Sequence, residues 1–186
     1  MPSIKTLIIA AAGTGGHVFP ALVVARQAKE EGMQVVWIGT EAGLENKIVP
    51  KAGFELLKIS SSPVLGKSYF KKMLGLSRVL FSTFKMMRFL KKLNADAVIC
   101  FGGYVSVPVG LAARLRNLPL YLHEQNAVPG LSNRVLSKFA TKIFLGFPNS
   151  IKNKKAIFVG NPVRKEILAI KKRSQYDKEK LNLLIV

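Results

Sequence analysis

The sequence predicts an α/β protein with a doubly wound parallel sheet, and three observations lead to that class. Short apolar runs alternate with segments whose apolar residues recur at helical spacing, a pattern typical of parallel sheets with helices on both faces. Three of the runs end in glycine-rich or polar loops, at the strand ends where such sheets hold ligands. The length of 186 residues is sufficient for one well-buried domain of this kind.

Seven short apolar runs are predicted to be strands. In chain order they are TLIIAA (6–11), QVVWIGT (34–40), FELLKIS (54–60), AVICF (97–101), LYLHE (120–124), KIFLGF (142–147) and AIFVGN (156–161).

Five segments between these runs show helical spacing. The first helix carries Pro20 in its opening turn, where the missing N–H of proline costs no hydrogen bond. The five segments are 19–32, 43–52, 67–93, 109–117 and 130–140.

The end of the sequence differs from the rest. KKRSQYDKEK (171–180) is polar and charged, and LNLLIV (181–186) is an apolar run that would open another α/β unit. We therefore expect one domain over 1–163, a linker over 164–180, and the first strand of a truncated second domain over 181–186.

The composition predicts a folded protein that binds anions. The formal net charge is +19, with 29 Lys and Arg against 10 Asp and Glu. Such a surface attracts nucleic acid, acidic lipid headgroups or a phosphorylated substrate, and charge alone does not choose among them.

A single cysteine, Cys100, excludes an internal disulfide and a multi-cysteine zinc site, and its apolar neighbours indicate an inert core thiol. No apolar run approaches the length of a spanning helix, so we expect a cytoplasmic protein that at most lies on a membrane. We interpret the apolar N-terminus as a first strand rather than a signal peptide.

The loop AAGTGGH (11–17) joins the first strand to the first helix. Free amides and the helix dipole at such a junction attract phosphate or another anion. The glycine spacing fits neither a P-loop nor a dinucleotide fingerprint, and a tight structural turn is the alternative. His17, at the end of this loop, is either a packing histidine or a base beside bound phosphate.

Two further loops carry polar groups at strand ends. GGYVS (102–106) follows AVICF, and HEQN (123–126) follows LYL. The HEQN side chains can bind sugar hydroxyls or hold neighbouring loops together. For Glu124 and Gln125 both readings stay open, whereas His123 and Asn126 favour the structural one.

The stretch 67–93 contains eight cations and no acidic residue. Helical geometry places Leu76, Val79, Leu80, Phe84, Met87 and Leu90 on a predicted core-facing arc, and Lys71, Arg78, Lys85 and Lys92 on the opposite side. In or beside the cationic arc lie Phe70, Leu74, Phe81 and Phe89. Large apolar side chains among cations are typical of a helix that lies on an anionic membrane, and a plain solvated face is the alternative. Gly75 could divide the stretch into two helices.

With these loops in place, the sequence resembles the MurG family of bacterial glycosyltransferases, in glycosyltransferase family 28. The matching segments follow the family's order along the chain. They are GTGGHVFPAL (13–22), WIGTEAGLENKIVPKAGFEL (37–56), GGYVSVPVGLAA (102–113), LHEQNAVPGLSNRVLSKFATKIF (122–144) and VGNPVR (159–164). Ala12 replaces the first glycine of the family's first loop.

The resemblance implies a GT-B enzyme of peptidoglycan synthesis, built from two Rossmann-like domains. Such an enzyme transfers N-acetylglucosamine from UDP-GlcNAc to lipid I, the undecaprenyl-diphosphate-linked N-acetylmuramyl-pentapeptide, and the product is lipid II. The first domain binds the acceptor and the second binds most of the donor. This chain then corresponds to the Rossmann-like N-terminal half of a GT-B fold.

The resemblance also implies roles for particular residues. His17 becomes the candidate base for the acceptor 4-hydroxyl. The acceptor diphosphate would be bound by Gly13, Thr14, Gly15, Gly16, Gly102, Gly103 and Tyr104. The cleft and the donor would be bordered by Glu124, Gln125, Asn126 and Arg164, and the membrane contacted by Phe70, Lys71, Leu74, Arg78, Phe81, Lys85 and Phe89. No Asp-x-Asp occurs in the sequence, which fits a reaction without metal or other cofactor.

We therefore expect the chain to lie peripherally on the cytoplasmic face of the cell membrane and to be inactive alone. Other cell-wall synthesis proteins are possible partners, and nucleic acid is not expected. Two alternatives stay open: a membrane-recruiting acceptor subunit of a split N-acetylglucosaminyltransferase, and a basic nucleic-acid-binding protein.

Overall fold

The computed structural model describes residues 4–59 and 69–170, with side chains described for 4–59 and 75–170. Its centre is a seven-stranded parallel sheet in the order β3-β2-β1-β4-β5-β6-β7. The strands are β1 (Thr6–Ala11), β2 (Gln34–Thr40), β3 (Glu55–Ile59), β4 (Ala97–Gly102), β5 (Leu120–Glu124), β6 (Lys142–Leu145) and β7 (Ala156–Phe158). The predicted α/β class and all seven predicted strands are confirmed.

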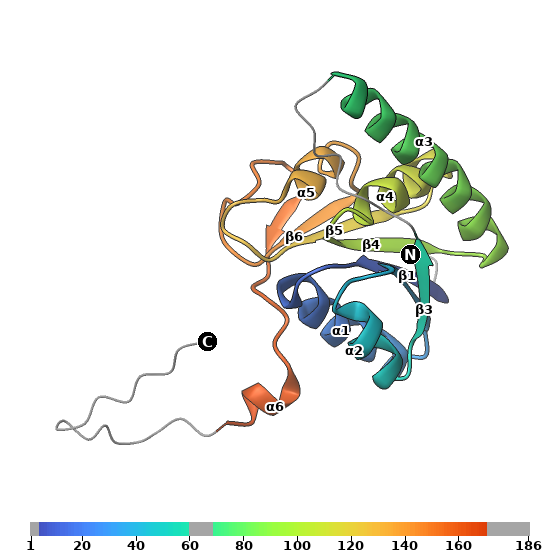
Figure 1. Cartoon of the computed structure of the whole chain (residues 1–186). Coiled ribbons are helices and arrows are strands. Elements are labelled where there is room, and N and C mark those ends of the chain that lie inside the picture. The colour runs from blue at the N-terminus through green and yellow to red at the C-terminus, as the bar shows by residue number, and fades with distance from the viewer. Residues whose placement is uncertain (1–3, 60–68, 171–186) are drawn as a thin grey trace.

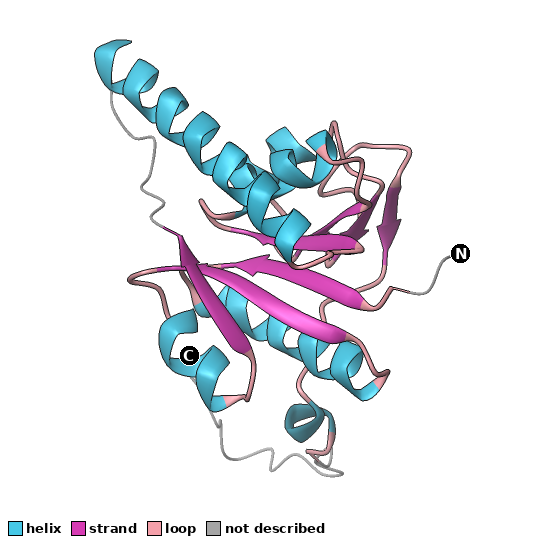
Figure 2. Cartoon of the chain, turned by 90° about the vertical axis from the view of Figure 1, so that its right-hand side faces the viewer, coloured by secondary structure: helices cyan, strands magenta, loops and turns pink. Residues whose placement is uncertain are grey.

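Helices cover both faces of the sheet, as Figure 1 and the turned view in Figure 2 show. One face carries α1 (Gly15–Glu30) and α2 (Glu45–Lys51), and the other carries α3 (Tyr69–Lys92), α4 (Ser106–Leu115) and α5 (Leu131–Leu136). Each face has its own apolar core, because successive strand residues point to opposite sides. Ile9 and Trp37 thus pack with α1, whereas Ile8 and Ile38 pack with α3 and α4.

The strand order reverses beside β1, because the chain builds β2 and β3 on one side of it and β4 to β7 on the other. Open α/β sheets bind ligands at such a switch point, outside the carboxyl ends of the strands. The pairing of β1 with β4 shifts register between Ala10 and Ala11, so that Ala11 lies opposite Gly102. The loops that follow these two strands therefore begin side by side.

The buried face of α3 differs from the predicted one. α3 is continuous through Gly75, and the buried residues in its described part, 75–92, are Gly75, Thr83, Met86 and Leu90. Leu76, Leu80 and Phe84, predicted to face the core, are exposed. α3 packs chiefly on α4. Leu90, also predicted for the core, is fully buried, and Met87 packs partly against the core. Hydrophobicity alone therefore placed only part of the buried face of this helix correctly.

The segment after β7 passes to the α1 side of the molecule (Figure 1). Its short helix α6 (Lys165–Leu168) lies within the predicted linker. Lys165 pairs with Glu30 at 2.8 Å and Glu166 with Arg26 at 3.6 Å, which places α6 beside α1. Both pairs are exposed, so each contributes little to stability. The predicted boundary at 163 stays a prediction, and residues 171–186 lie outside the described part of the chain.

Candidate functional site

The loops after β1 and β4 meet at the switch point. Gly102 and Gly103 both have positive φ, at +110° and +81°, which side chains rarely adopt. A Cβ on Gly103 would lie 2.7 Å from the carbonyl oxygen of Ala12, so the glycine permits the two loops to touch. The Ser106 hydroxyl donates to the Gly102 carbonyl at 2.7 Å and accepts from the Gly102 amide at 3.2 Å.

His17 lies in the first turn of α1 with its ring against Gly102. A Cβ on Gly102 would lie 2.7 Å from the His17 Nε2 atom. The Nδ1 atom is buried and has no hydrogen-bond partner among the described residues. Burial lowers the pKa of His17 from 6.5, and it outweighs the opposing influence of the Glu124 charge and the Ala12 backbone. The ring is therefore neutral near pH 7, the state in which a general base can accept a proton.

The start of α1 offers unpaired donors. Within the described residues, the amides of Thr14, Gly15 and Gly16 make no hydrogen bond, whereas the Gly13 amide donates to Glu45. Thr14 and Gly16 are exposed, so solvent or a ligand reaches them. Free amides at the end of a sixteen-residue helix can bind an anion. The predicted loop 13–16 is thus brought next to His17 and to the loop of Gly102.

Glu124 is a buried residue that holds the third loop, which begins with HEQN (123–126), by hydrogen bonds. Its carboxylate is 1% exposed and accepts hydrogen bonds from four N–H groups. The donors are the Asn126 amide (2.9 Å), Asn126 Nδ2 (3.1 Å), the Gly130 amide (3.0 Å) and Asn133 Nδ2 (3.0 Å). These hydrogen bonds therefore fix the conformation of residues 125–130. The negative charge of Glu124 also acts to raise the pKa of His17.

Gln125 and His123 join this loop to β4. Gln125 Nε2 donates to the Phe101 carbonyl at 2.8 Å, and the Gln125 carbonyl accepts from Asn161. His123 stacks on the Phe101 ring at 5.3 Å between centroids, and burial lowers its pKa from 6.5. Both side chains are buried, which fits the structural reading given to His123.

The remaining predicted cleft residues are exposed. Tyr104 and Asn126 reach solvent at the ends of their loops. The Arg164 guanidinium lies 4.9 Å from the centre of the Phe19 ring, and Phe19 in turn contacts Gly15, where a Cβ would lie 3.0 Å from the ring. Arg164 is thus brought to the α1 end of the site.

Sequence reasoning did not assign a role to Glu45. This first residue of α2 is fully buried, and it binds both the Gly13 amide and Thr40. The glycines at 39 and 43 in GTEAGLE were the available signal, because both lie against its side chain.

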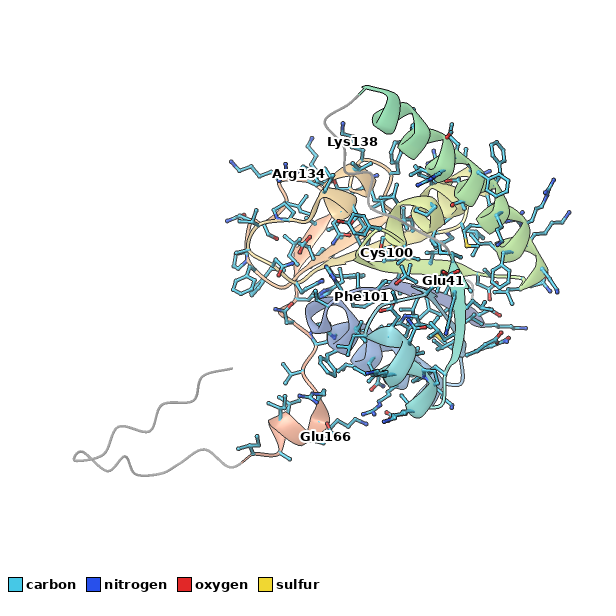
Figure 3. The ribbon with its side chains drawn as sticks, viewed as in Figure 1. Glu41, Cys100, Phe101, Arg134, Lys138 and Glu166 are labelled. Carbon is cyan, nitrogen blue, oxygen red and sulfur yellow. The ribbon has the colours of Figure 1, made fainter. Side chains whose placement is uncertain are left out.

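Cys100 lies at the centre of the sheet in Figure 3, fully buried beside Phe101. Burial raises the pKa of its thiol to about 12, so the predicted inert thiol is confirmed. Among residues 4–59 and 69–170, no three His, Cys, Asp or Glu side chains gather closely enough to hold a metal ion. The metal-independent reaction stays a prediction.

The outer face of α3 combines rings with cations. Phe81 is 74% exposed and Phe84 is 61% exposed. A shallow pocket of about 280 Å³ is lined by Phe81, Phe84, Lys85, Arg88, Phe89 and Lys92. Phe89 also packs partly against the core, so it is less available than predicted. The side chains of Phe70, Lys71 and Leu74 lie outside the described part. None of the described helices has the length and apolar character needed to cross a bilayer.

The fold and the loop geometry define a Rossmann-like domain of the kind found in GT-B glycosyltransferases. Residues 7–145 match the glycosyltransferase family 28 N-terminal domain, and the chain belongs to this family. It is 44% identical, over 98% of its length, to the UDP-N-acetylglucosamine–N-acetylmuramyl-(pentapeptide) pyrophosphoryl-undecaprenol N-acetylglucosamine transferase of Acinetobacter baylyi. The alignment covers 52% of that protein, so the chain spans about half the length of the curated relatives it matches.

Solved structures agree with this assignment. The crystal structure of MurG from Acinetobacter baumannii matches with a TM-score of 0.72 at 41% identity, over 82% of this chain and 44% of that one. MnaA of S. aureus, solved with UDP, matches with a TM-score of 0.66 at 12% identity, over 95% of this chain and 50% of that one. The second likeness shows the fold alone.

Proposed function

We propose that the chain is the acceptor-binding half of an N-acetylglucosaminyltransferase that converts lipid I to lipid II. The activity named for its relatives supplies the reaction class. The observation that carries the proposal is the juxtaposition, at the switch point, of the unpaired amides of 14–16 with the neutral, partly buried His17. A diphosphate needs such donors, and a sugar hydroxyl needs such a base.

In the proposed reaction His17 takes the proton of the acceptor 4-hydroxyl. The hydroxyl oxygen then attacks the anomeric carbon of GlcNAc, the new glycosidic bond forms, and the bond from that carbon to UDP breaks. UDP leaves with the bonding electron pair. Amides and helix ends, rather than a metal ion, would stabilise the departing diphosphate.

The other predicted residues take supporting parts in this proposal. Gly13, Gly102 and Gly103 shape the acceptor loops, and Tyr104 borders them. Asn126 and Arg164 are exposed where a donor sugar diphosphate would enter, whereas Glu124 and Gln125 act from buried positions by holding their loop. Most contacts to UDP-GlcNAc would come from the half of the relatives that this chain does not match.

We further propose that α3 rests on the cytoplasmic face of the cell membrane, where lipid I is embedded. Its exposed rings can enter the acyl boundary, and its cations can meet anionic headgroups. This placement would bring the diphosphate of a membrane-bound acceptor toward the loops of β1 and β4.

The test uses a water-soluble, short-chain analogue of lipid I. Titration calorimetry should show that the chain binds this analogue, that inorganic diphosphate competes, and that UDP-GlcNAc alone binds weakly. Incubation of the chain with the analogue and labelled UDP-GlcNAc should give no product. Failure to bind the analogue, or product formation by the chain alone, would contradict the proposal.

A further inference from the structure

Glu45 is a fully buried carboxylate at the junction of β1, β2 and α2. Its Oε2 atom accepts from the Gly13 amide at 3.0 Å. Its Oε1 atom accepts from the Thr40 amide at 2.8 Å and from the Thr40 hydroxyl at 2.7 Å. Burying a carboxylate is costly unless donors surround it, and these three hydrogen bonds offset that cost. Neither strand alone supplies this set of donors.

The turn before α2 leaves room for this carboxylate. A Cβ on Gly39 would lie 2.7 Å from Glu45 Cγ, and a Cβ on Gly43 would overlap the Oε2 atom. The Leu44 amide donates to the Gly13 carbonyl at 3.2 Å. Gly13 is therefore held from both its N–H and its C=O by consecutive residues of one turn.

The glycine loop (11–17) is also held at its first residue, Ala11, by a side chain of β2. Trp37 Nε1 donates to the Ala11 carbonyl at 2.8 Å. The loop is thus anchored at Ala11 and Gly13 by β2 and its following turn, while the next three amides make no bond within the described residues. Gly13 has φ of +96°, a conformation that glycine adopts without the steric cost that a side chain brings.

We propose that Glu45 is a positioning residue for the glycine loop: through Gly13, it sets the three following amides where the acceptor diphosphate binds. The inference rests on the proposed function. A positioning role also predicts that removing the charge of Glu45 weakens ligand binding, the opposite of what charge repulsion alone predicts. A buried anion near a diphosphate site repels the ligand, so removing the charge would strengthen binding if Glu45 had no positioning role.

Glutamine is the informative substitution because it keeps the shape and loses the charge. The glutamine side chain has a single oxygen, which can accept from Thr40 or from Gly13 but not from both. Its NH2 group then faces the N–H of the other residue, and two donors cannot form a hydrogen bond with each other. Thr40 presents two donors to its oxygen, so the lost bond is the one to Gly13. We expect Glu45→Gln to weaken binding of the lipid I analogue about tenfold, the loss of one hydrogen bond to a charged group.

Thr40→Val is the matched control. It removes the hydroxyl donor to the same carboxylate but keeps the backbone bond and the bond to Gly13. We expect it to lower the melting temperature while the affinity for the analogue stays within about twofold. All affinities are measured well below the melting temperature of each variant, and hydrogen exchange reports the Gly13 amide directly. That amide should exchange faster in Glu45→Gln and not in Thr40→Val.

Several outcomes would overturn the inference. Unchanged or tighter binding by Glu45→Gln contradicts it, and so does an equal loss of affinity in Thr40→Val. Should Glu45→Gln fail to fold, Gly43→Ala is the second variant. The added methyl group displaces the Glu45 Oε2 atom, so this variant should also lose the bond to Gly13 and weaken binding of the analogue. A wild-type chain that does not bind the analogue overturns the proposed function, and this inference with it. Wild-type binding that survives in the variants overturns this inference alone.

Discussion

Gly102 shows how a single residue determines the site. Its φ of +110° strains any residue with a side chain, and the His17 ring occupies the space where that side chain would begin. The candidate base, His17, therefore packs against the backbone of the loop that follows β4. Gly103 meets the same two constraints, but the atom against it is the Ala12 carbonyl oxygen rather than a side chain of the site.

We predict that Gly102→Ala lowers the free energy of unfolding by about 1–3 kcal/mol, through backbone strain and displacement of His17. Displacement should also return the His17 pKa toward 6.5, because the ring becomes more solvated. Chemical denaturation and an NMR titration of the histidine measure the two effects.

Two glycines serve as controls for this substitution. Gly160 has φ of +77° and no atom within 4 Å of a Cβ, so Gly160→Ala reports strain alone. Gly130 has φ of −63° and open space, so Gly130→Ala should change little. If Gly102→Ala matched Gly160→Ala and left the His17 pKa unchanged, the contact between the ring and the loop would not exist.

At the scale of elements, α3 is the helix whose surface is least explained by packing. Part of the face predicted for the core is exposed, so Leu76, Leu80 and Phe84 add apolar area to the side where Phe81 and the cations lie. A soluble helix seldom presents this many large apolar residues to water. The wider apolar surface strengthens the case for membrane contact over a plain solvated face.

We predict that Phe81→Ser weakens binding to vesicles of phosphatidylglycerol and phosphatidylethanolamine about tenfold, because burial of one ring is lost. Leu168→Ser is the control, since Leu168 is 70% exposed on α6, away from α3. Co-sedimentation measures both. Equal effects of the two variants would contradict a specific role for α3.

The same experiment separates membrane from nucleic acid. Binding to duplex DNA should fall steeply as salt rises, and Phe81→Ser should not alter it, because it depends on counterion release. Binding to vesicles should keep an apolar part that salt does not screen. DNA binding that persists at physiological salt would favour the nucleic-acid alternative.

At the scale of the whole molecule, both histidines have pKa values lowered from 6.5 by burial. The unfolded chain therefore takes up protons as the pH falls through 6.5, while the folded chain resists until lower pH. Because the unfolded state binds more protons in this window, the free energy of unfolding falls as the pH falls below 6.5. The stabilisation is fully present above that value.

We predict that equilibrium unfolding between pH 7.5 and 5 shows this loss, with a slope of at most about 1.4 kcal/mol per pH unit for each histidine. His17→Gln should reduce the slope whether or not it changes stability at pH 7.5. Asp96 does not interfere, because the amides of Thr6 and Lys5 hold its pKa below 3.8, and its contribution is lost only at more acidic pH. A slope that is the same in His17→Gln would contradict a buried, neutral His17.

The local parts of the fold were predictable. Continuous apolar runs mark strands buried on both faces, and all seven were placed correctly from sequence. The class of sheet predicted that the loops after β1, β4 and β5 lie at one edge, because the carboxyl ends of parallel strands share it, whereas the strand order decided that the loops after β1 and β4 meet. The resemblance supplied the roles of the site residues, and those roles stay predictions.

The sequence by itself determined the class of sheet, the place of the candidate site and the family, because apolar runs and loop motifs are local properties of the chain. Only the tertiary structure decided which face of α3 is buried, since that depends on how the helix packs on α4 and on the core. It also decided that Glu45 binds Gly13, because that residue becomes a neighbour of its carboxylate only once β1 and β2 pair. Contacts between segments distant in the chain are set by packing, which hydrophobic periodicity does not encode.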